Sequence, residues 1–293
     1  MDLRNEKGLT EAEFLAQYDP NKYEKPSVTS DILVFGMSEK LDALKVLLIK
    51  RKDHPYIGQW ALPGGFINMS ESAYEAACRE LEEETGLTNV YLEQLYTMSQ
   101  PKRDPRMRVL SIVYMALIPE TVVKAGDDAS EAVWFTINFK PDKLELFNLE
   151  YNVHISYNLE TKEFINGVVK TMGYVPILDT ISKRAIIPRN DDCVIGEPVY
   201  LDNSLLAFDH AEIVLEGLLR LRNKVDYTDV AFNFVSKKFT LPYLQRVYET
   251  ILGTTLYTAN FRSDISGKIE PIKGEKATSL VGGRKSQLYK YVG

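Results

Sequence analysis

Cysteine is scarce in this chain, and long apolar runs are missing from it. The 293 residues include two cysteines, Cys78 and Cys193, whose wide separation fits reduced thiols better than a disulfide framework. No apolar run reaches the roughly 18 residues of a membrane-spanning helix, and the opening MDLRNEKGLTEAEF lacks the apolar core of a signal peptide. We therefore exclude a disulfide-rich secreted protein and a membrane protein, and we expect a cytoplasmic location.

The remaining composition is that of a globular protein long enough for two domains. Apolar residues make up 45% of the chain and charged residues 26%. The net charge of −6 is unevenly distributed, because residues 237–293 carry ten Lys or Arg against four Asp or Glu. A basic C-terminal segment on an acidic body favours a polyanionic partner, although a solvated surface is an equally good interpretation.

The densest chemical pattern lies at residues 65–87, which read GFINMSESAYEAACRELEEETGL. Ser70 or Ser72 can cap a helix, and the alanines that follow favour helical structure. Gly86 stands where the end of a helix needs a left-handed residue. We therefore predict a helix from Ser72 to Thr85.

Three glutamates, Glu80, Glu83 and Glu84, share one face of this predicted helix because they are spaced by three and four residues. Stacked like charges repel, at a cost of roughly 0.2 to 0.5 kcal/mol per pair. Either Arg79 or a divalent cation can offset that repulsion. Oxygen ligands without Cys or His favour Mg²⁺ or Mn²⁺, which commonly share their coordination with substrate phosphates. The cluster indicates metal-assisted phosphoryl chemistry, and the alternative is a solvated acidic helix face.

The complete pattern resembles the signature of the Nudix hydrolase family. This sequence matches every defined position of that signature. The resemblance implies an α/β/α sandwich that cleaves a nucleoside diphosphate linked to another group. It also implies that Glu80, Glu83 and Glu84 are catalytic metal ligands for Mg²⁺ or Mn²⁺ and that Arg79 orients them in catalysis. Glu71 and Gly65 are the supporting residues that the same resemblance predicts.

Strands are predicted at residues 30–36, 46–50, 90–97 and 109–118, and a basic loop joins the last two. The loop at residues 99–108 carries cations that can meet phosphate or ribose oxygens, unless it is simply a solvated loop. Pro101 lies fifteen residues after Gly86, a placement similar to that in the ADP-ribose pyrophosphatase branch, so the resemblance implies an ADP-ribose-like ligand. The predicted substrate-binding residues are Arg51, Arg103, Arg106 and Arg108.

The boundaries of a Nudix domain are predicted at residues 29 and 225. Residues 1–28 are expected to form an arm with a short helix that packs on the first sheet. Residues 140–200 depart from the family pattern and predict a β-rich insertion, with a hairpin that turns at residues 160–162. In the acidic turn before it, Asp127, Asp128 or Glu131 can supply a general base.

The last part of the chain predicts a winged helix-turn-helix domain at residues 226–293. A helix capped by Asp209 closes the sandwich opposite the Nudix helix. Helices at residues 241–252 and 258–266 are then followed by strands at 269–272 and 287–292. This half resembles the Nudix-related transcriptional regulators of NAD metabolism. The candidate DNA-binding residues are Arg262, Lys268, Arg284 and Lys285.

Two functions remain open at this stage. The three aligned carboxylates favour a Mg²⁺-dependent pyrophosphohydrolase acting on ADP-ribose or a similar nucleoside diphosphate sugar, which is our main hypothesis. The winged helix favours an ADP-ribose-responsive transcriptional regulator, which is the alternative. Asp264 argues against this alternative, because its carboxylate would repel DNA phosphate. A homodimer is expected under either hypothesis, because paired winged helices suit two half-sites and the family resemblance implies that ADP-ribose-type Nudix enzymes are commonly dimers.

Overall fold

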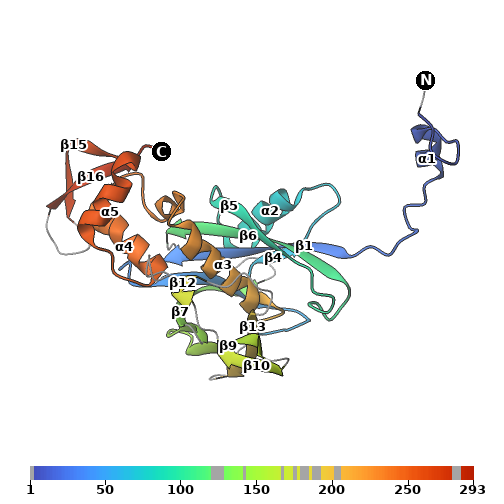
Figure 1. Ribbon diagram of the computed structural model, residues 1–293, viewed down its shortest axis with the longest axis horizontal. Coiled ribbons are helices and arrows are strands. Elements are labelled where there is room, and N and C mark those ends of the chain that lie inside the picture. The colour runs from blue at the N-terminus through green and yellow to red at the C-terminus, as the bar shows by residue number, and fades with distance from the viewer. Residues whose placement is uncertain are drawn as a thin grey trace.

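The structure is a computed structural model that describes residues 3–119, 129–140, 143–165, 168–173, 177–178, 185–186, 193–200, 206–278 and 285–293. A long mixed sheet lies at its centre, the winged helix packs at one end, and the N-terminal segment extends from the other (Figure 1). The helical elements are α1 (Glu11–Gln17), α2 (Ala73–Thr85), α3 (His210–Lys224), η1 (Val230–Phe234), α4 (Leu241–Leu252), α5 (Thr258–Ile265) and η2 (Ser266–Lys268).

Within the described ranges, eleven strands belong to the central sheet. Their order is β10-β9-β8-β7-β2-β1-β6-β5, with β3 beside β2, β4 beside β1 and β13 beside β9. These strands are β1 (Ser27–Met37), β2 (Leu44–Arg51), β3 (Trp60–Ala61), β4 (Gly64–Phe66), β5 (Tyr91–Met98), β6 (Val109–Pro119), β7 (Ala129–Lys140), β8 (Lys143–Asn148), β9 (Val153–Ile165), β10 (Val168–Gly173) and β13 (Cys193–Tyr200). A separate pair contains β11 (Ile177–Leu178) and β12 (Ala185–Ile186).

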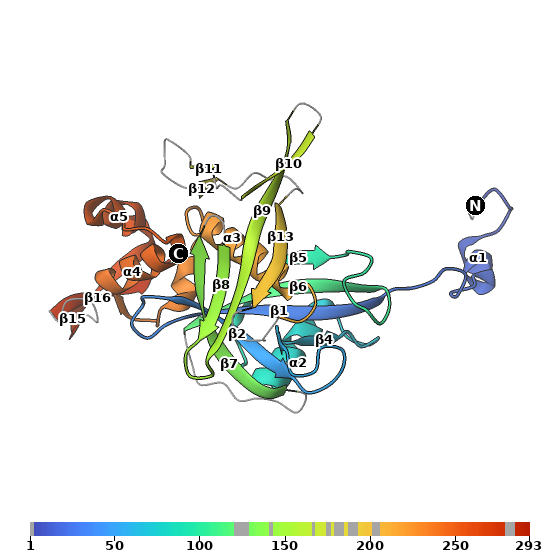
Figure 2. The ribbon, with the colours of Figure 1, turned by 90° about the horizontal axis from the view of Figure 1, so that it is seen from below.

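The two faces of the sheet are covered by different helices, α2 on one side and α3 on the other (Figure 2). Successive residues of a strand point to opposite faces, and β1 is apolar on both. Ile32 and Val34 pack in the cluster that contains Leu81 of α2, whereas Leu33 and Phe35 belong to the larger cluster that includes α3. The predicted α/β/α sandwich is therefore confirmed.

Helix α2 begins and ends as its sequence predicts. The Ser72 hydroxyl accepts from the Glu75 backbone N–H, and the Glu75 carboxylate accepts from the Ser72 N–H, which completes a capping box. Gly86 closes the helix in the left-handed conformation, at φ 73°. The Nudix glutamates thus stand on a helix that is fixed at both ends.

In the described residues the 140–200 region is β-rich, as predicted, but its strands β8, β9, β10 and β13 belong to the central sheet and not to a subdomain set apart from it. Strands β7, β8 and β9 continue the central sheet, so Leu144 and Ile155 belong to the main core. The predicted turn at residues 160–162 is also wrong, because β9 runs through it to Ile165, which pairs with Val168 of β10. Residues 160–162 are polar but contain no Gly, Pro or Asn, whereas Asn-Gly, the usual hairpin pair, follows Ile165.

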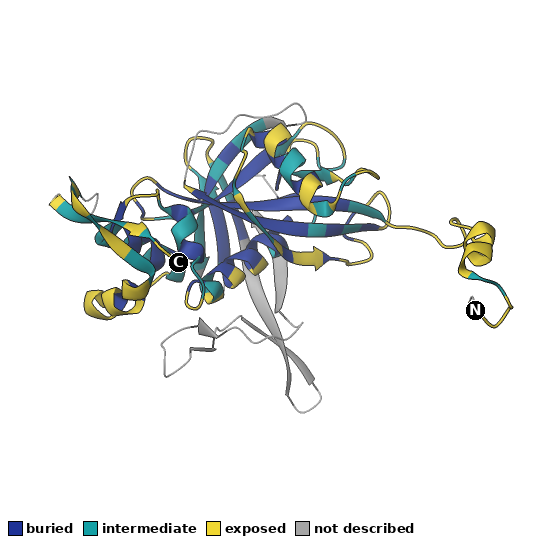
Figure 3. Ribbon diagram, turned by 90° about the horizontal axis from the view of Figure 1, so that it is seen from above, coloured by how far each residue is buried: buried dark blue, intermediate teal, exposed yellow. Residues whose placement is uncertain are grey.

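The N-terminal arm contains its predicted short helix but does not pack on the sheet. Helix α1 has a complete capping box at Thr10 and Glu13, and none of its residues is buried. It lies away from the body of the protein (Figure 3). Phe14 and Leu15 remain exposed because seven residues provide too little apolar surface to hold the segment against the sheet.

The winged helix has the predicted helices, caps and strands. Thr240 caps α4, Gly253 ends it at φ 69°, and α5 follows. Its sheet has the order β14-β16-β15, with bounds β14 (Phe239–Thr240), β15 (Ile269–Thr278) and β16 (Lys285–Tyr291). None of the helices in the described part of the chain has the length and apolarity that a membrane span requires.

The winged helix and the Nudix domain share one hydrophobic core. The main cluster of buried side chains runs from Leu218 of α3 through Phe234 of η1 to Leu244 of α4. In addition, the Thr250 hydroxyl of α4 donates to the Leu41 carbonyl between β1 and β2, at 2.6 Å. The two halves are therefore packed together.

Candidate functional site

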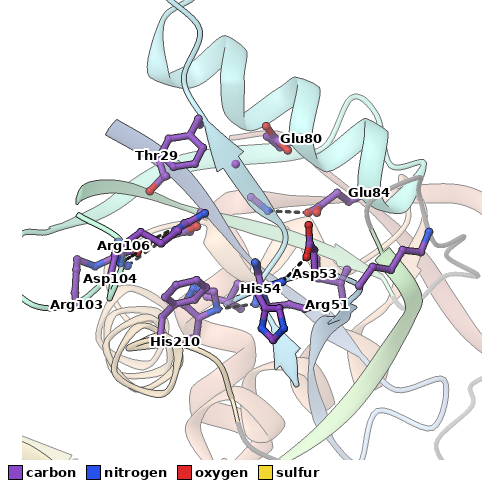
Figure 4. A pocket seen from close by; sticks show the side chains of 18 residues that line it. Thr29, Arg51, Asp53, His54, Glu80, Glu84, Arg103, Asp104, Arg106 and His210 are labelled. Carbon is purple, nitrogen blue, oxygen red and sulfur yellow. Dashed lines mark hydrogen bonds and ion pairs between the residues drawn. The ribbon is translucent and has the colours of Figure 1, made fainter. Parts of the chain in front are cut away.

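A cavity of about 370 Å³ opens beside the C-terminal half of α2 and is lined by many charged side chains. Glu80 and Glu84 enter it from α2, while Arg106 and His210 lie toward the other side of the view (Figure 4). The lining residues are Thr29, Asp31, Ile49, Arg51, Lys52, Asp53, His54, Leu62, Gly64, Gly65, Phe66, Glu80, Glu84, Arg103, Asp104, Arg106, Phe208 and His210.

Arg79 gathers three of the predicted carboxylates. Its guanidinium donates to Glu71 at 2.7 Å, to Glu80 at 2.7 Å and to Glu83 at 3.0 Å. The hydrogen bonds from Arg79 are the main reason that the pKa of Glu71 falls to about 2, and the same bonds raise the pKa of Arg79. The positive charge that the acidic face requires is thus supplied by a neighbouring side chain.

Glu80 and Glu84 are the two carboxylates of α2 that line the cavity. Glu84 is buried and accepts the Gly64 backbone N–H at 2.7 Å. The Glu80 carboxylate lies against Gly65, where a Cβ atom would overlap it. Burial raises the pKa of Glu80, and the hydrogen bond from Arg79 opposes that shift. Glu83 does not line the cavity, and 58% of its side chain is exposed.

The carboxylates fit a divalent cation in part. Within the described residues, no three His, Cys, Asp or Glu side chains are already arranged to hold a metal ion. Arg79 explains this, because it binds Glu71, Glu80 and Glu83 at once. Glu80 and Glu84 nevertheless present hard oxygen atoms to the cavity, which is the ligand type that Mg²⁺ and Mn²⁺ prefer. Glu83 would have to leave Arg79 to join them.

Two of the predicted substrate-binding arginines lie over aromatic rings at the cavity. Arg51 donates to the Pro55 carbonyl at 2.8 Å, and its guanidinium lies 5.1 Å from the Phe208 ring centroid. Arg106 pairs with Asp104 at 2.7 Å and lies 5.2 Å from the Phe66 ring centroid. Burial is the main cause, and the charge of Arg106 a further cause, of a lowered pKa at Arg51. Added negative charge would therefore be favoured here.

The other two predicted arginines have different surroundings. The Arg103 side chain is 4% exposed and donates to both oxygens of Asp209, at 2.6 and 2.8 Å, with Asp31 at 3.5 Å. It lines the cavity as part of this buried ion-pair group. Arg108 lies outside the lining and donates to the Gln100 carbonyl. Asp209 is the N-cap residue of α3, as predicted, but its side chain makes no capping hydrogen bond, because Arg103 binds both oxygens of its carboxylate.

Sequence reasoning missed Phe66, Phe208 and His210 as cavity residues. Phe208 precedes α3 with a left-handed φ of 54°, and His210 is the first residue of that helix. The His210 Nδ1 atom accepts the Leu62 backbone N–H at 2.8 Å, and complete burial lowers its pKa, so the ring is neutral. No local motif marks these residues, because only folding brings them to the Nudix helix.

The candidate general bases do not meet the cavity in the described residues. Glu131 lies on β7, pairs with Lys50 at 3.2 Å and is not part of the lining. Asp127 and Asp128 lie outside the described residues.

The candidate DNA-binding residues are placed unequally on the winged helix. Arg262 is exposed on α5, and Lys285 is exposed at the start of β16. Lys268, by contrast, forms an ion pair with Asp229 at 2.7 Å. Arg284 lies outside the described residues. Tyr257, which stands immediately before α5 and is 75% exposed, is an additional surface residue that the sequence analysis did not select.

Family models and relatives agree with this two-part architecture. Residues 25–150 match the NUDIX domain, and residues 231–291 match the NrtR DNA-binding winged helix domain. The chain is 29% identical over 286 residues to the ADPR responsive transcriptional repressor NtrR of Acinetobacter baylyi, covering 96% of this chain and 88% of the relative. It is 45% identical over 119 residues to the ADP-ribose pyrophosphatase of Methanocaldococcus jannaschii, covering 41% of this chain and 67% of the relative.

Solved structures extend the likeness to the full chain. A MutT/nudix family protein from Enterococcus faecalis has a TM-score of 0.72 and 30% identity, over 98% of this chain and 95% of that one. Shewanella oneidensis NrtR in complex with a 27mer DNA has a TM-score of 0.57 and 26% identity, over 90% of this chain and 93% of that one. The chain belongs to the Nudix family and joins a Nudix domain to a C-terminal winged helix domain of the NrtR type.

Proposed function

We propose that this protein is an ADP-ribose-responsive DNA-binding regulator whose Nudix cavity is the sensor. The observation that carries this proposal is the shared core, which packs the arginine-lined cavity and the winged helix into one body. Similarity to the Acinetobacter baylyi repressor along 96% of the chain supports the same arrangement of sensor and effector. The hydrolase, our main hypothesis from sequence, thus becomes the second candidate.

The cavity has the chemistry that an ADP-ribose-like ligand requires. Arg51 and Arg106 offer guanidinium groups for diphosphate oxygens. Phe66 and Phe208 offer ring faces against which a planar base can stack. Mg²⁺ or Mn²⁺ held by Glu80 and Glu84 would neutralise part of the diphosphate charge and, in a hydrolytic reaction, activate the attacking water.

For DNA, helix α5 is the proposed recognition helix. Arg262 and Asn260 are exposed on it, and these residue types make bidentate contacts to guanine and adenine in the major groove. Lys273 and Lys276 of β15 and Lys285 of β16 are exposed cations for the phosphate backbone. A homodimer would present two such helices to two half-sites.

The regulator proposal is tested with the full-length protein. A duplex is selected from random sequence by the wild-type protein, and its affinity is measured by fluorescence anisotropy against a scrambled duplex, with and without ADP-ribose. We expect the selected duplex to bind at least about 1,000-fold more tightly and ADP-ribose to change that affinity. Arg262→Ala should cost about 1–3 kcal/mol of binding free energy. Equal affinity for both duplexes would overturn the proposal.

The second candidate is a metal-dependent pyrophosphohydrolase, and the complete Nudix signature with Glu80 and Glu84 in the cavity favours it. Identity of 45% to an archaeal ADP-ribose pyrophosphatase also supports it. The activity can coexist with regulation in one chain, because hydrolysis would remove the proposed signal.

Hydrolysis is tested by product release from ADP-ribose and other nucleoside diphosphate compounds, with Mg²⁺ and then with Mn²⁺. Glu83→Gln and Glu84→Gln should each abolish turnover. Glu82→Gln is the matched control, because Glu82 is an exposed glutamate of the same helix that directly precedes Glu83 and occupies a position the signature does not define. Binding of ADP-ribose without turnover in the wild type would leave the cavity as a sensor only.

A further inference from the structure

Helix α3 connects the two functional regions of this protein directly. Its first residue, His210, lines the cavity, and Arg222 in its last turn contacts α4 of the winged helix. With 15 residues the helix spans about 22 Å. A displacement at one end of such an element can reach the other end without passing through a flexible linker.

At the cavity end, the Asp209 side chain pairs with Arg103 instead of capping its own helix. It occupies the N-cap position of α3, where an aspartate carboxylate ordinarily accepts a backbone N–H of the first turn. Here it makes no such bond, and Arg103 donates to both of its oxygens. Asp209 does not line the cavity, whereas Arg103 does. The pair therefore links a residue that a ligand can reach with the start of α3.

At the other end, Arg222 joins α3 to the segment that positions α5. Its Nε–H donates to the Ile251 carbonyl at 3.0 Å, and its guanidinium lies 4.8 Å from the Phe139 ring centroid. Ile251 belongs to the last turn of α4, which Gly253 ends in a left-handed conformation before the chain enters α5. A shift of Arg222 acts directly on this turn.

We propose that Asp209 and Arg222 are positioning residues that make α3 the relay between ligand binding and DNA binding. This inference rests on the proposed regulator function. A diphosphate in the cavity offers Arg103 an alternative bidentate anion. Asp209 is then released to cap α3, the first turn of the helix shifts, and Arg222 transmits that shift to α4 and α5. The two partners of Asp209 supply the two discrete arrangements that coupling between sites requires.

The relay is tested on full-length wild type, Arg222→Met and Arg220→Met. Methionine keeps the apolar stem of Arg222 but removes its donor, and Arg220 is the matched control on the exposed side of the same helix. ADP-ribose affinity is measured by calorimetry, and affinity for the duplex selected by the wild type by anisotropy. We expect ADP-ribose to change wild-type DNA affinity by about tenfold or more. Arg222→Met should reduce this factor to near one with unchanged ADP-ribose affinity, and Arg220→Met should keep it.

Asp209→Asn gives a second, independent test, because asparagine can cap the helix but cannot form the ion pair with Arg103. Without ligand, this variant should bind DNA as ADP-ribose-saturated wild type does, and ADP-ribose should change its DNA affinity little. If Arg222→Met fails to fold, as judged by circular dichroism, Asp209→Asn decides the question. If ADP-ribose changes the DNA affinity of the folded variants by the same factor as in wild type, the relay is overturned and the proposed function is not. A wild type that shows no effect of ADP-ribose on DNA binding overturns the proposed function and the relay with it.

Discussion

Two adjacent glycines before α2 have different physical tasks. A Cβ at Gly64 would lie 2.5 Å from the Ser30 carbonyl oxygen, and the residue has φ 152°. For a Cβ at Gly65, the three nearest atoms all belong to the carboxyl group of Glu80, and that side chain can turn away. Gly64 therefore serves the pairing of β4 with β1, whereas Gly65 serves the position of Glu80.

Substituting alanine at each glycine in turn distinguishes an effect on the stability of the fold from an effect on the metal site. Gly64→Ala should lower the free energy of unfolding by about 1–3 kcal/mol, because backbone must move. Gly65→Ala should leave that free energy within about 1 kcal/mol of wild type, yet weaken Mn²⁺ binding by about 10–100-fold. Urea unfolding and calorimetric Mn²⁺ titration measure the two effects. Undiminished Mn²⁺ affinity in Gly65→Ala would mean that Glu80 does not bind the ion from this position.

The buried His210 should make stability depend on pH. Burial lowers its pKa in the folded chain, so below about pH 6.5 the unfolded chain binds a proton that the folded chain does not. The free energy of unfolding should therefore fall as pH falls from 7 to 5, by up to about 1.4 kcal/mol per pH unit from this residue. His210→Gln, whose amide oxygen can still accept the Leu62 N–H, should remove that slope.

The control for this experiment is His54→Gln, because His54 is exposed in the loop beside the cavity. Urea unfolding at several pH values should give His54→Gln the wild-type slope. Equal slopes for wild type and His210→Gln would show that His210 takes up its proton in the folded protein as well.

At the scale of elements, α3 packs closely against β1 at Gly217. A Cβ at Gly217 would overlap the end of the Leu33 side chain on β1, so the absence of a side chain at this position sets the depth of packing. Gly217→Ala should cost about 1–3 kcal/mol of stability through overpacking, and Leu33→Ala about 2–5 kcal/mol through a cavity. The double variant should lose less than the sum, because the new methyl group fills part of the new space.

Urea unfolding of both single variants and the double variant completes this mutant cycle. Arg220→Ala on the exposed side of α3 is the control and should stay within about 0.5 kcal/mol of wild type. Strict additivity of Gly217→Ala and Leu33→Ala would contradict the close contact between the helix and β1.

Elements with a local chemical signal could be predicted from the sequence. Ser72 and Thr240 mark the starts of α2 and α4, and Gly86 and Gly253 mark their ends, because caps act within one helical turn. The apolar run at residues 30–36 likewise predicted the strand β1. The Nudix signature gathered the glutamates and Arg79 because all of them lie on one helix or beside it.

Features that depend on distant partners could not be predicted. The alternation of β8 and β9 shows which faces are apolar but not which strand lies beside them, so their place in the central sheet was missed. Asp209 is the predicted N-cap residue of α3, but the partner of its side chain, Arg103, is 106 residues away in sequence. Phe208 and His210 reached the cavity by the same long-range packing.

At the scale of the whole molecule, the continuous core couples the unfolding of the two halves, because each half covers apolar surface of the other. Phe234 of η1 is completely buried between the two halves, in the cluster that contains residues of α3 and α4. Separating the halves would expose this cluster to water, at about 25 cal/mol per Å² of apolar surface. We therefore expect one cooperative unfolding transition.

Two probes report the two halves. Both tryptophans, Trp60 and Trp134, lie in the central sheet, so their fluorescence follows the Nudix domain. Hydrogen exchange of α4 peptides in increasing urea follows the winged helix. The two midpoints should coincide in wild type. Phe234→Ala should lower the free energy of unfolding that each probe reports by the same amount, about 3–5 kcal/mol. A shift of the α4 transition alone would mean that the winged helix is an independent unit, and a rigid connection through α3 would then lose its physical basis.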